Sequence, residues 1–509
     1  MEQKGIVYLV GAGPGRADLI TVRGQELLRQ ADCVIYDRLA GATLLAYARQ
    51  DAELIPVPKR IGLPSVPGSV SQDQINDLIV ERALAGKAVV RLKGGDPTIF
   101  GRVAEEMAVL AGAGIAFEIV PGVTAALGAS AYTGILLTDR TSSSQVVFVT
   151  GHEAEGKTTS SIDWAHLARF QGAIVFYMGM TNLGGIAQAL IQNGMDKATP
   201  CAVIADATLP TQRTVRDTLD RLADRCRQED LQPPAIVVVG RVVGEDDRLA
   251  WFSRLPLFGR TIVVTRDARG NAEFAQRIIA CGGNPLAHAT IRLRPLTEGA
   301  PFLEVLSRLG RYQWLVFTSA SGVEFFFAAL DRMGKDARSL GAASVAAIGP
   351  ATSERLRSLG IKADLVPREF TSLGLGRQLM EGASLKGRDI LLLRSELADD
   401  ELKDLLEAAG AQVDQVAVYT AEPAPGDARL LIEQIREGRV HWLTFASSSE
   451  SRAFFGQVPA DLVSARGVKV ASIGPVTSGQ LRQLGLKVDA EARDHTLDGL
   501  IQAMIGSSP

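Results

Sequence analysis

The stretch GIVYLVGAGPGRADLI (5–20) decides the class of fold. Its apolar first six residues predict a buried strand, and a glycine-rich turn leads directly toward an expected helix. The turn has the spacing of a dinucleotide-binding G-x-G-x-x-G loop, but Arg16 stands where the last glycine would be and Pro14 lies inside it. Because Pro14 removes a backbone N–H that a bound pyrophosphate would use, the loop favours a different ligand.

The same order of strand, turn and helix continues over the first 240 residues. Helical stretches alternate with short apolar runs, which lie at 5–10, 33–36, 88–92, 145–150, 173–178 and 235–240. Such runs predict parallel strands covered by helices on both faces. One of these helices begins near Ser71, which forms a capping box with Gln74, and ends at Gly86. Ligands of such sheets usually bind at the carboxyl ends of the strands.

The second half of the chain contains a duplication. Three landmarks recur in one order: GRTIVVTR (259–266) as GRDILLLR (387–394), WLVFTSAS (314–321) as WLTFASSS (442–449), and VAAIGPATSERLRSLGIKAD (345–364) as VASIGPVTSGQLRQLGLKVD (470–489). The offsets are 128, 128 and 125 residues. We therefore expect two similar α/β lobes with a small-molecule cleft between them. Residues 246–258 break the alternation and are the expected linker.

Composition excludes several classes of function. The net charge of −3 argues against broad attraction to nucleic acid or to an anionic membrane. The four cysteines are widely spaced without a C-x-x-C motif, so neither a disulfide framework nor a zinc site is expected. No apolar run reaches the roughly 18–20 residues of a membrane span, and the first residues do not form a signal peptide. We expect a cytoplasmic protein that binds no metal.

Six motifs of the first half together identify a resemblance. They are VGAGPGRADLITVRG (10–24), YDRL (36–39), VPKR (57–60), VVRLKGGDPTIFGR (89–102), VPGVTAALGASAYTGILLTDR (120–140) and YMGM (177–180). In this order they resemble the tetrapyrrole C-methylases, in particular uroporphyrinogen-III C-methyltransferase. The resemblance implies two α/β lobes with S-adenosylmethionine in the cleft between them and S-adenosylhomocysteine as the product.

The resemblance also implies roles for individual residues. Cofactor contacts fall on Pro14, Gly94, Gly95, Asp96, Ile99, Thr124, Ala125, Met178 and the backbone at Ala207, where the family usually has glycine. Catalytic roles fall on Asp37 as a proton acceptor and on Lys59 as a donor. Arg38, Arg60 and Arg102 are expected to pair with carboxylates of the substrate.

The second half resembles uroporphyrinogen-III synthase, through its VTR opening, FTSASGV, LLLRS, VAVYTAEP and the two I-G-P motifs. The implied substrate, hydroxymethylbilane, carries eight carboxylates and loses water on ring closure. Each I-G-P-x-T should end a strand and begin a helix whose free N–H groups bind carboxylates. The expected substrate residues are Thr352 and Thr477 as helix caps, with Ser319, Ser321, Ser447 and Ser448 on neighbouring turns. Tyr419 matches a family tyrosine that assists loss of the hydroxyl.

These observations predict a bifunctional enzyme of tetrapyrrole synthesis, with the methyltransferase at 1–245 and the synthase at 259–509. The synthase would form uroporphyrinogen III with ring D inverted, and the methyltransferase would add two methyl groups to give precorrin-2, toward siroheme or cobalamin. The methylase family commonly dimerises, so we expect a homodimer through that half. Two alternatives stay open: a methylase of a later corrin intermediate, or a tetrapyrrole-binding regulator with an inactive C-terminal half.

Overall fold

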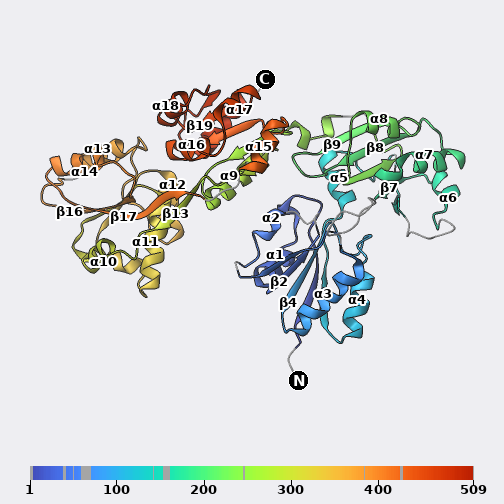
Figure 1. Ribbon diagram of the computed structural model, residues 1–509, viewed down its shortest axis with the longest axis horizontal. Coiled ribbons are helices and arrows are strands. Elements are labelled where there is room, and N and C mark those ends of the chain that lie inside the picture. The colour runs from blue at the N-terminus through green and yellow to red at the C-terminus, as the bar shows by residue number, and fades with distance from the viewer. Residues whose placement is uncertain are drawn as a thin grey trace. The chain divides into compact units, whose positions relative to one another are not determined.

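The computed structural model describes residues 4–37, 42–49, 51–58, 70–141, 143–152, 161–244, 247–382, 384–424 and 428–507. The chain divides into two compact units, Met1–Thr261 with Ile278–Asn284 and Ile262–Arg277 with Pro285–Pro509. Four five-stranded sheets with flanking helices form the described part, two sheets in each half of the chain (Figure 1). The predicted α/β class is confirmed.

The first lobe of the methylase-like unit is a wholly parallel sheet in the order β3-β2-β4-β1-β5. Its strands are β1 (Ile6–Gly11), β2 (Cys33–Tyr36), β3 (Glu53–Pro56), β4 (Ala88–Lys93) and β5 (Ala116–Val120). Helices α1 (Val22–Gln30) and α2 (Ala42–Leu45) pack on one face, and α3 (Gln72–Leu84) and α4 (Val103–Gly112) on the other (Figure 1). The capping box of Ser71 and Gln74 is present at the start of α3. Parallel strands covered on both faces are confirmed here.

The second lobe departs from the predicted parallel sheet. Its order is β6-β7-β10-β8-β9, and β10 pairs antiparallel with both neighbours. The strands are β6 (Val146–Thr150), β7 (Ala173–Tyr177), β8 (Pro200–Ala205), β9 (Arg213–Thr218) and β10 (Ala235–Val239), and the helices are α5 (Ala125–Thr133), α6 (Trp164–Ala168), α7 (Leu183–Gln192) and α8 (Leu222–Gln228). A strand buried on both faces is apolar in either direction, so composition does not reveal its orientation.

The synthase-like unit has one sheet ordered β12-β11-β18-β19-β20 and another ordered β13-β17-β16-β14-β15. The first is built from β11 (Thr261–Val264), β12 (Asn284–Ala287), β18 (Trp442–Phe445), β19 (Lys469–Ser472) and β20 (Ala490–Glu491). The second is built from β13 (Ile291–Pro295), β14 (Trp314–Phe317), β15 (Ser344–Ala347), β16 (Asp389–Ser395) and β17 (Gln412–Pro423). The helices are α9 (Ala268–Ala280), α10 (Ala300–Ser307), α11 (Ala320–Arg332), α12 (Pro350–Ser358), α13 (Ser372–Gly382), α14 (Glu401–Ala408), α15 (Arg429–Arg436), α16 (Ser448–Phe455), α17 (Ala460–Ala465), α18 (Pro475–Gln483) and α19 (Leu497–Gly506).

The two sequence repeats exchange strands, so neither repeat is a lobe. The opening strand of the first repeat, β11, pairs with β18 of the second, with Ile262 opposite Trp442. The opening strand of the second repeat, β16, pairs with β14 of the first, with Ile390 opposite Trp314. Both pairings are parallel and occur at equivalent repeat positions. Each sheet therefore needs strands from both repeats, and one repeat alone leaves both sheets incomplete.

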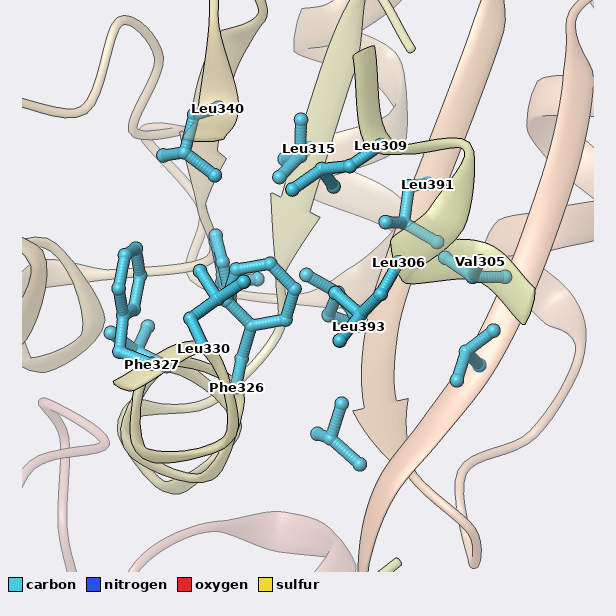
Figure 2. Packing of buried hydrophobic residues seen from close by; sticks show 14 of the residues in the cluster. Val305, Leu306, Leu309, Leu315, Phe326, Phe327, Leu330, Leu340, Leu391 and Leu393 are labelled. Atoms are coloured by element: carbon cyan, nitrogen blue, oxygen red, sulfur yellow. The ribbon is translucent and has the colours of Figure 1, made fainter. Parts of the chain in front are cut away.

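The core of the β14–β16 lobe shows how these sheets are held. Leu315 and Leu393 from neighbouring strands pack against Phe326 and Leu330 of α11, and all four are 0% exposed (Figure 2). Truncating a buried phenylalanine such as Phe326 to alanine costs about 3–5 kcal/mol.

The expected linker is tied to the methylase-like unit. Of its residues, 247–258 are described, and they include two short 3-10 helices, Asp247–Leu249 and Phe252–Arg254. The Trp251 indole donates a hydrogen bond to the Ala131 carbonyl at 2.8 Å. The Phe252 side chain is fully buried, and its ring contacts Tyr132 of α5 with centroids 4.8 Å apart. This segment therefore extends the methylase-like unit.

Candidate functional sites

Three glycine-containing loops meet at the carboxyl edge of the first sheet. Gly13, after β1, and Gly95, after β4, exchange two backbone hydrogen bonds of 3.2 and 2.8 Å. A Cβ at Gly11 would lie 2.6 Å from the Gly122 nitrogen, and a Cβ at Gly122 would lie 2.3 Å from the Gly95 carbonyl oxygen. Only glycine allows this approach, so the main structural role of these glycines is to let the three loops pack closely together.

Pro14 connects this edge to the second lobe. A Cβ on Gly128 of α5 would lie 2.5 Å from the Pro14 Cβ, so the proline ring rests on the space that Gly128 leaves. The next contact comes from Arg16, whose backbone N–H donates to the Thr208 hydroxyl at 3.2 Å. The G-A-G-P-G loop is therefore held between α5 and the loop after β8.

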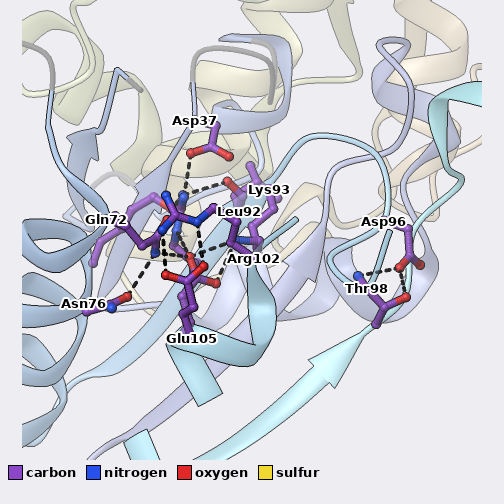
Figure 3. A network of polar contacts seen from close by, with 12 residues as sticks. Asp37, Gln72, Asn76, Leu92, Lys93, Asp96, Thr98, Arg102 and Glu105 are labelled. Carbon is purple, nitrogen blue, oxygen red and sulfur yellow. Dashed lines mark hydrogen bonds and ion pairs between the residues drawn. The ribbon is translucent and has the colours of Figure 1, made fainter. Parts of the chain in front are cut away.

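Asp96 and Thr124, two predicted cofactor contacts, already have protein partners. One Asp96 oxygen accepts from the Thr98 backbone and hydroxyl at 2.7 and 2.5 Å, and the other accepts from the Gly122 N–H at 3.0 Å (Figure 3). The Thr124 hydroxyl pairs with the Tyr177 hydroxyl at 2.7 Å and does not cap α5. Each carboxylate oxygen has two lone pairs, so Asp96 keeps capacity for a ligand.

Tyr177 is a residue of this site that the sequence reasoning missed. Its hydroxyl also accepts the Ala126 N–H at 3.2 Å, and burial raises the pKa of its phenol. Phe100 and Phe148 pack against its ring with centroids 5.1 and 5.6 Å away. The only signal in the sequence was its place in YMGM, directly before Met178.

Backbone strain concentrates around the same loops. Five residues other than glycine have left-handed φ values between 49° and 72°: Phe100, Arg102, Met178, Asp206 and Thr208. Such conformations cost about 1–3 kcal/mol each and cluster at ligand sites. Phe100 directly follows the predicted contact Ile99, and Asp206 and Thr208 stand on either side of the predicted contact Ala207. Burial also raises the pKa of the Asp206 carboxyl.

The structure thus brings Pro14, Gly95, Asp96, Thr124 and Ala125 together through direct contacts or chain adjacency. Gly94 precedes Gly95, while Met178 and Ala207 follow the ends of β7 and β8 in the second lobe. These glycine-lined, partly strained loops fit a small cofactor such as S-adenosylmethionine. Met178 leaves 42% of its side chain exposed there, which is available apolar surface.

The predicted proton acceptor Asp37 follows β2 at this same edge. Arg91 of the adjacent strand β4 donates from Nη2 to its carboxylate at 2.5 Å. The Asp37 side chain is 17% exposed, whereas Arg91 is fully buried. The predicted donor Lys59 and the predicted substrate residues Arg38 and Arg60 lie outside the described residues.

Arg102, the remaining predicted substrate residue of this unit, has a partner of its own. Two of its guanidinium nitrogens donate to the Glu105 carboxylate at 2.6 Å, and this hydrogen bonding raises the pKa of Arg102 (Figure 3). Its side chain is 54% exposed, so a substrate carboxylate would compete with Glu105 at the surface.

In the synthase-like unit, the contacts join Tyr419 with Ser319. The Tyr419 hydroxyl donates to the Ser319 hydroxyl at 3.1 Å, and the same serine oxygen accepts the Gly322 N–H at 2.9 Å at the start of α11. Ser321 lies in the first turn of that helix. In the other repeat, Ser447 caps α16 and lies 2.9 Å from the Ser449 hydroxyl, while Ser448 donates to the Val476 carbonyl at 3.4 Å.

The predicted caps Thr352 and Thr477 are wrong as caps. Both I-G-P motifs do end a strand and begin a helix, α12 and α18, but the N-cap residues are Gly349 and Gly474. Proline takes the first helical position because its φ suits it and no N–H is needed there. The threonines then fall two residues later and are buried, 3% and 4% exposed.

The residues that the structure describes lack two kinds of feature. They contain no group of three or more histidine, cysteine or acidic side chains placed to hold a metal ion. None of the helices among them combines the length and apolar character needed to span a bilayer.

Comparisons with known proteins match the two halves separately. The family model for tetrapyrrole (corrin/porphyrin) methylases matches residues 6–223, and the model for uroporphyrinogen-III synthase HemD matches residues 272–502. A uroporphyrin-III C-methyl transferase from Thermus thermophilus, solved with S-adenyl homocysteine, is 36% identical over 47% of this chain and 99% of that one, with a TM-score of 0.41. A uroporphyrinogen III synthase structure from the same species is 22% identical over 49% of this chain and 98% of that one, with a TM-score of 0.37.

One curated relative matches nearly the whole chain. The porphyrin biosynthesis protein HemD of Ruminiclostridium josui is 32% identical over 503 residues, 99% of this chain and 98% of the relative. The uroporphyrinogen-III C-methyltransferase of Bacillus subtilis is 38% identical over 69% of this chain and 71% of the relative. The siroheme synthase of Chromobacterium violaceum is 46% identical over 50% of this chain, which spans about half of that relative, 53%.

Fold, sites and comparisons together define an enzyme of porphyrin and siroheme biosynthesis with two catalytic units in one chain. The chain belongs to the family in which an S-adenosylmethionine-dependent tetrapyrrole methylase, here at 6–223, is fused to a HemD uroporphyrinogen-III synthase, here at 272–502.

Proposed function

We propose that the second unit closes hydroxymethylbilane to uroporphyrinogen III with ring D inverted, and that the first unit methylates this product twice to precorrin-2. The supporting observation is that one edge of the methylase sheet carries both the glycine loops after β1 and β4 and the Asp37 carboxylate after β2. Since β2 and β4 are neighbours, with Tyr36 opposite Leu92, the cofactor loops and the acceptor face the same space.

In the methylase unit, bound S-adenosylmethionine supplies an electrophilic methyl group. Pro14, Gly95, Asp96 and Thr124 would hold this cofactor on the loop contacts described above. Methylation of a pyrrole carbon leaves the ring positively charged. Asp37 then stabilises this charge and accepts the proton that leaves the ring, a function suited to a carboxylate at the rim of a buried site.

In the synthase unit, Tyr419 assists departure of the hydroxyl as water. Its O–H is held by the Ser319 oxygen at 3.1 Å, which fixes the direction of the phenol. The helix N-termini at Gly349 and Gly474 carry no side-chain cap, so their N–H groups are available to carboxylates of the linear substrate.

The test is to incubate the purified full chain with hydroxymethylbilane, with and without S-adenosylmethionine. We expect isomer III alone without the cofactor, and a dimethylated product with it. Formation of only the non-inverted isomer I, as in spontaneous closure, would refute the synthase assignment. Failure to incorporate methyl groups into added uroporphyrinogen III would refute the methylase assignment.

The homodimer through the methylase half remains part of the proposal. Leu127 of α5 and Leu136 beyond its end are 53% and 52% exposed, which suits a surface covered by a second copy. Sedimentation of the full chain and of Leu127→Asp tests this. A wild-type monomer at micromolar concentration, or a variant that dimerises as the wild type does, would contradict it.

A further inference from the structure

A buried ion cluster lies behind Asp37. Its members are Arg91 and Lys93 on β4 and Glu106 on α4, with side chains 0%, 2% and 0% exposed. Figure 3 shows Asp37, Lys93 and Gln72 in the network of polar contacts to which the cluster belongs. On the same face of the sheet the cluster lies beside the buried amides of Gln72 and Asn76 and an apolar core that includes Ile75, Ile79 and Leu110. With Asp37, the cluster contains two cations and two carboxylates, so it is balanced only if all four groups take part.

Glu106 is the centre of the cluster. Its two oxygens accept from the Lys93 ammonium at 2.8 and 2.7 Å, and one of them also accepts from Arg91 Nε at 3.2 Å. Gln72 of α3 adds a hydrogen bond of 3.3 Å to the same carboxylate. Lys93 thus fixes Glu106, and Glu106 fixes one side of the Arg91 guanidinium.

The other nitrogens of Arg91 are also engaged. Nη1 donates to the Ile35 and Leu92 carbonyls at 3.3 and 3.2 Å, and Nη2 donates to Asp37 at 2.5 Å. A planar guanidinium held on three sides has one orientation, and its remaining edge is directed at the only member of the cluster that reaches the surface.

Such a cluster is costly to bury, and well-packed apolar side chains of similar size are often equally or more stabilising. Packing therefore does not account for it, whereas its connection to Asp37 does. A catalytic group must be held close to its productive geometry, and a misplacement of about 1 Å can lower a rate by about 100-fold.

We propose that Lys93 and Glu106 are positioning residues for methyl transfer, which orient Arg91 and, through it, the Asp37 carboxylate. This inference rests on the proposed role of Asp37 as the proton acceptor. Arg91 contacts the acceptor directly, Glu106 acts one contact further away through Arg91, and Lys93 acts two contacts further away through Glu106.

The decisive variant is Lys93→Met/Glu106→Gln, which removes one charge of each sign and leaves Arg91 paired with Asp37. We expect kcat for methylation of uroporphyrinogen III to fall about 10- to 100-fold. The Kd for S-adenosylhomocysteine, measured by calorimetry, should stay within about twofold, because the loop contacts of Asp96 and Thr124 are separate from the cluster. Hydroxymethylbilane cyclisation by the same preparation should be unchanged.

A double-mutant cycle with Asp37→Asn separates positioning from general damage. In the Asp37→Asn background, the double change should lower kcat no further. An equal loss in both backgrounds, or wild-type kcat in the Lys93→Met/Glu106→Gln variant, overturns the inference. Wild-type kcat in Asp37→Asn alone would instead overturn the proposed role of Asp37.

The matched control is Arg23→Met/Glu118→Gln, which removes an exposed ion pair of 2.8 Å from the same lobe and should leave kcat unchanged. If Lys93→Met/Glu106→Gln fails to bind S-adenosylhomocysteine, the cycle is repeated with Glu106→Asp, which keeps the charge and withdraws the carboxylate from Arg91. An equal loss of kcat in the wild-type and Asp37→Asn backgrounds, or wild-type kcat in Glu106→Asp, would again overturn the inference.

Discussion

Each half of the chain buries one glutamate beside its proposed site, and the two are compensated differently. Glu106 of the methylase unit lies between Lys93 and Arg91. Glu450 of the synthase unit is 4% exposed and accepts hydrogen bonds from the Ala446 N–H at 2.9 Å and the Thr265 hydroxyl at 3.3 Å. Among the described residues it forms no ion pair, and burial raises the pKa of its carboxyl.

The two units stabilise a buried carboxylate in different ways. Glu106 is one member of a balanced ion cluster, so removing its charge leaves buried cations without their partner. Glu450 accepts hydrogen bonds from neutral groups and is attracted by the Arg266 charge without pairing with it, and its burial outweighs both, so removing its charge relieves a desolvation cost. Opposite effects are therefore expected from the same substitution in the two units, and variants of the two glutamates and of the sites beside them test this contrast.

The largest effect is expected from Glu106→Gln alone. It removes the carboxylate that pairs with both Arg91 and Lys93, and the loss of these two buried pairs should cost about 3–5 kcal/mol in the free energy of unfolding. Hydrogen exchange of α4 and β4 peptides measures this locally, and Lys93→Met/Glu106→Gln should recover part of the loss. A cost below about 1 kcal/mol would mean that the cluster is not desolvated.

Next in size is Tyr419→Phe, which removes the hydroxyl that Ser319 holds. If this hydroxyl assists loss of water, the synthase kcat should fall about 100-fold while methylation continues unchanged. Tyr312→Phe is the matched control, because it removes a buried hydroxyl bonded to Asp414 at 2.5 Å in the same unit. Equal synthase rates in the two variants would leave Tyr419 without a catalytic role.

Gly128→Ala should weaken cofactor binding. The new Cβ meets the Pro14 ring at 2.5 Å and forces the loop or α5 to move. Overpacking of this kind costs about 1–3 kcal/mol, so we expect about a tenfold increase in the Kd for S-adenosylhomocysteine. Gly184→Ala in α7, where no atom lies within 4 Å of the new Cβ, should leave this Kd unchanged. If both alanine variants raise the Kd for S-adenosylhomocysteine equally, the contact between Gly128 and Pro14 is not the cause of the weaker binding.

The smallest effect is the pH dependence of Glu450→Gln. Because burial raises the folded-state pKa above the ordinary 4.5, the folded wild type binds this proton more tightly than the unfolded chain does. Its contribution to stability is therefore fully present below 4.5 and is lost as pH rises through the folded pKa. Glutamine keeps an acceptor for Ala446 and cannot ionise, so the variant should gain about 1 kcal/mol at neutral pH.

Thermal unfolding of the full chain between pH 4 and 8 checks this. The Tm of the variant should exceed that of the wild type by roughly 2–4 °C at neutral pH, and the two should converge at the acid end. A variant that is less stable at every pH would mean that the carboxylate is needed in its charged form.

Much of the site was readable as sequence, because close backbone approach requires glycine and leaves a local record. Gly13 and Gly95 are two such glycines. The Ser71 capping box is another local signal, because both of its residues lie within four positions of each other in the sequence. The threonine caps were wrong because the proline two residues before each threonine takes the first helical position and makes the preceding glycine the N-cap. The ion cluster was missed because Arg91 and Lys93 stand in an apolar strand, and their partners Glu106 and Asp37 reach them only through tertiary packing.

The α/β class, the two halves, the duplication and the family could all be predicted from the amino-acid sequence, since these depend on local pattern and on motif order. The tertiary structure alone decided that the repeats exchange strands, with Ile262 opposite Trp442 and Ile390 opposite Trp314. Two equivalent strands present the same apolar surface and the same hydrogen-bonding groups, so the sequence cannot state which copy each one pairs with. That choice is made by the path of the connecting chain and by burial of both sheet faces.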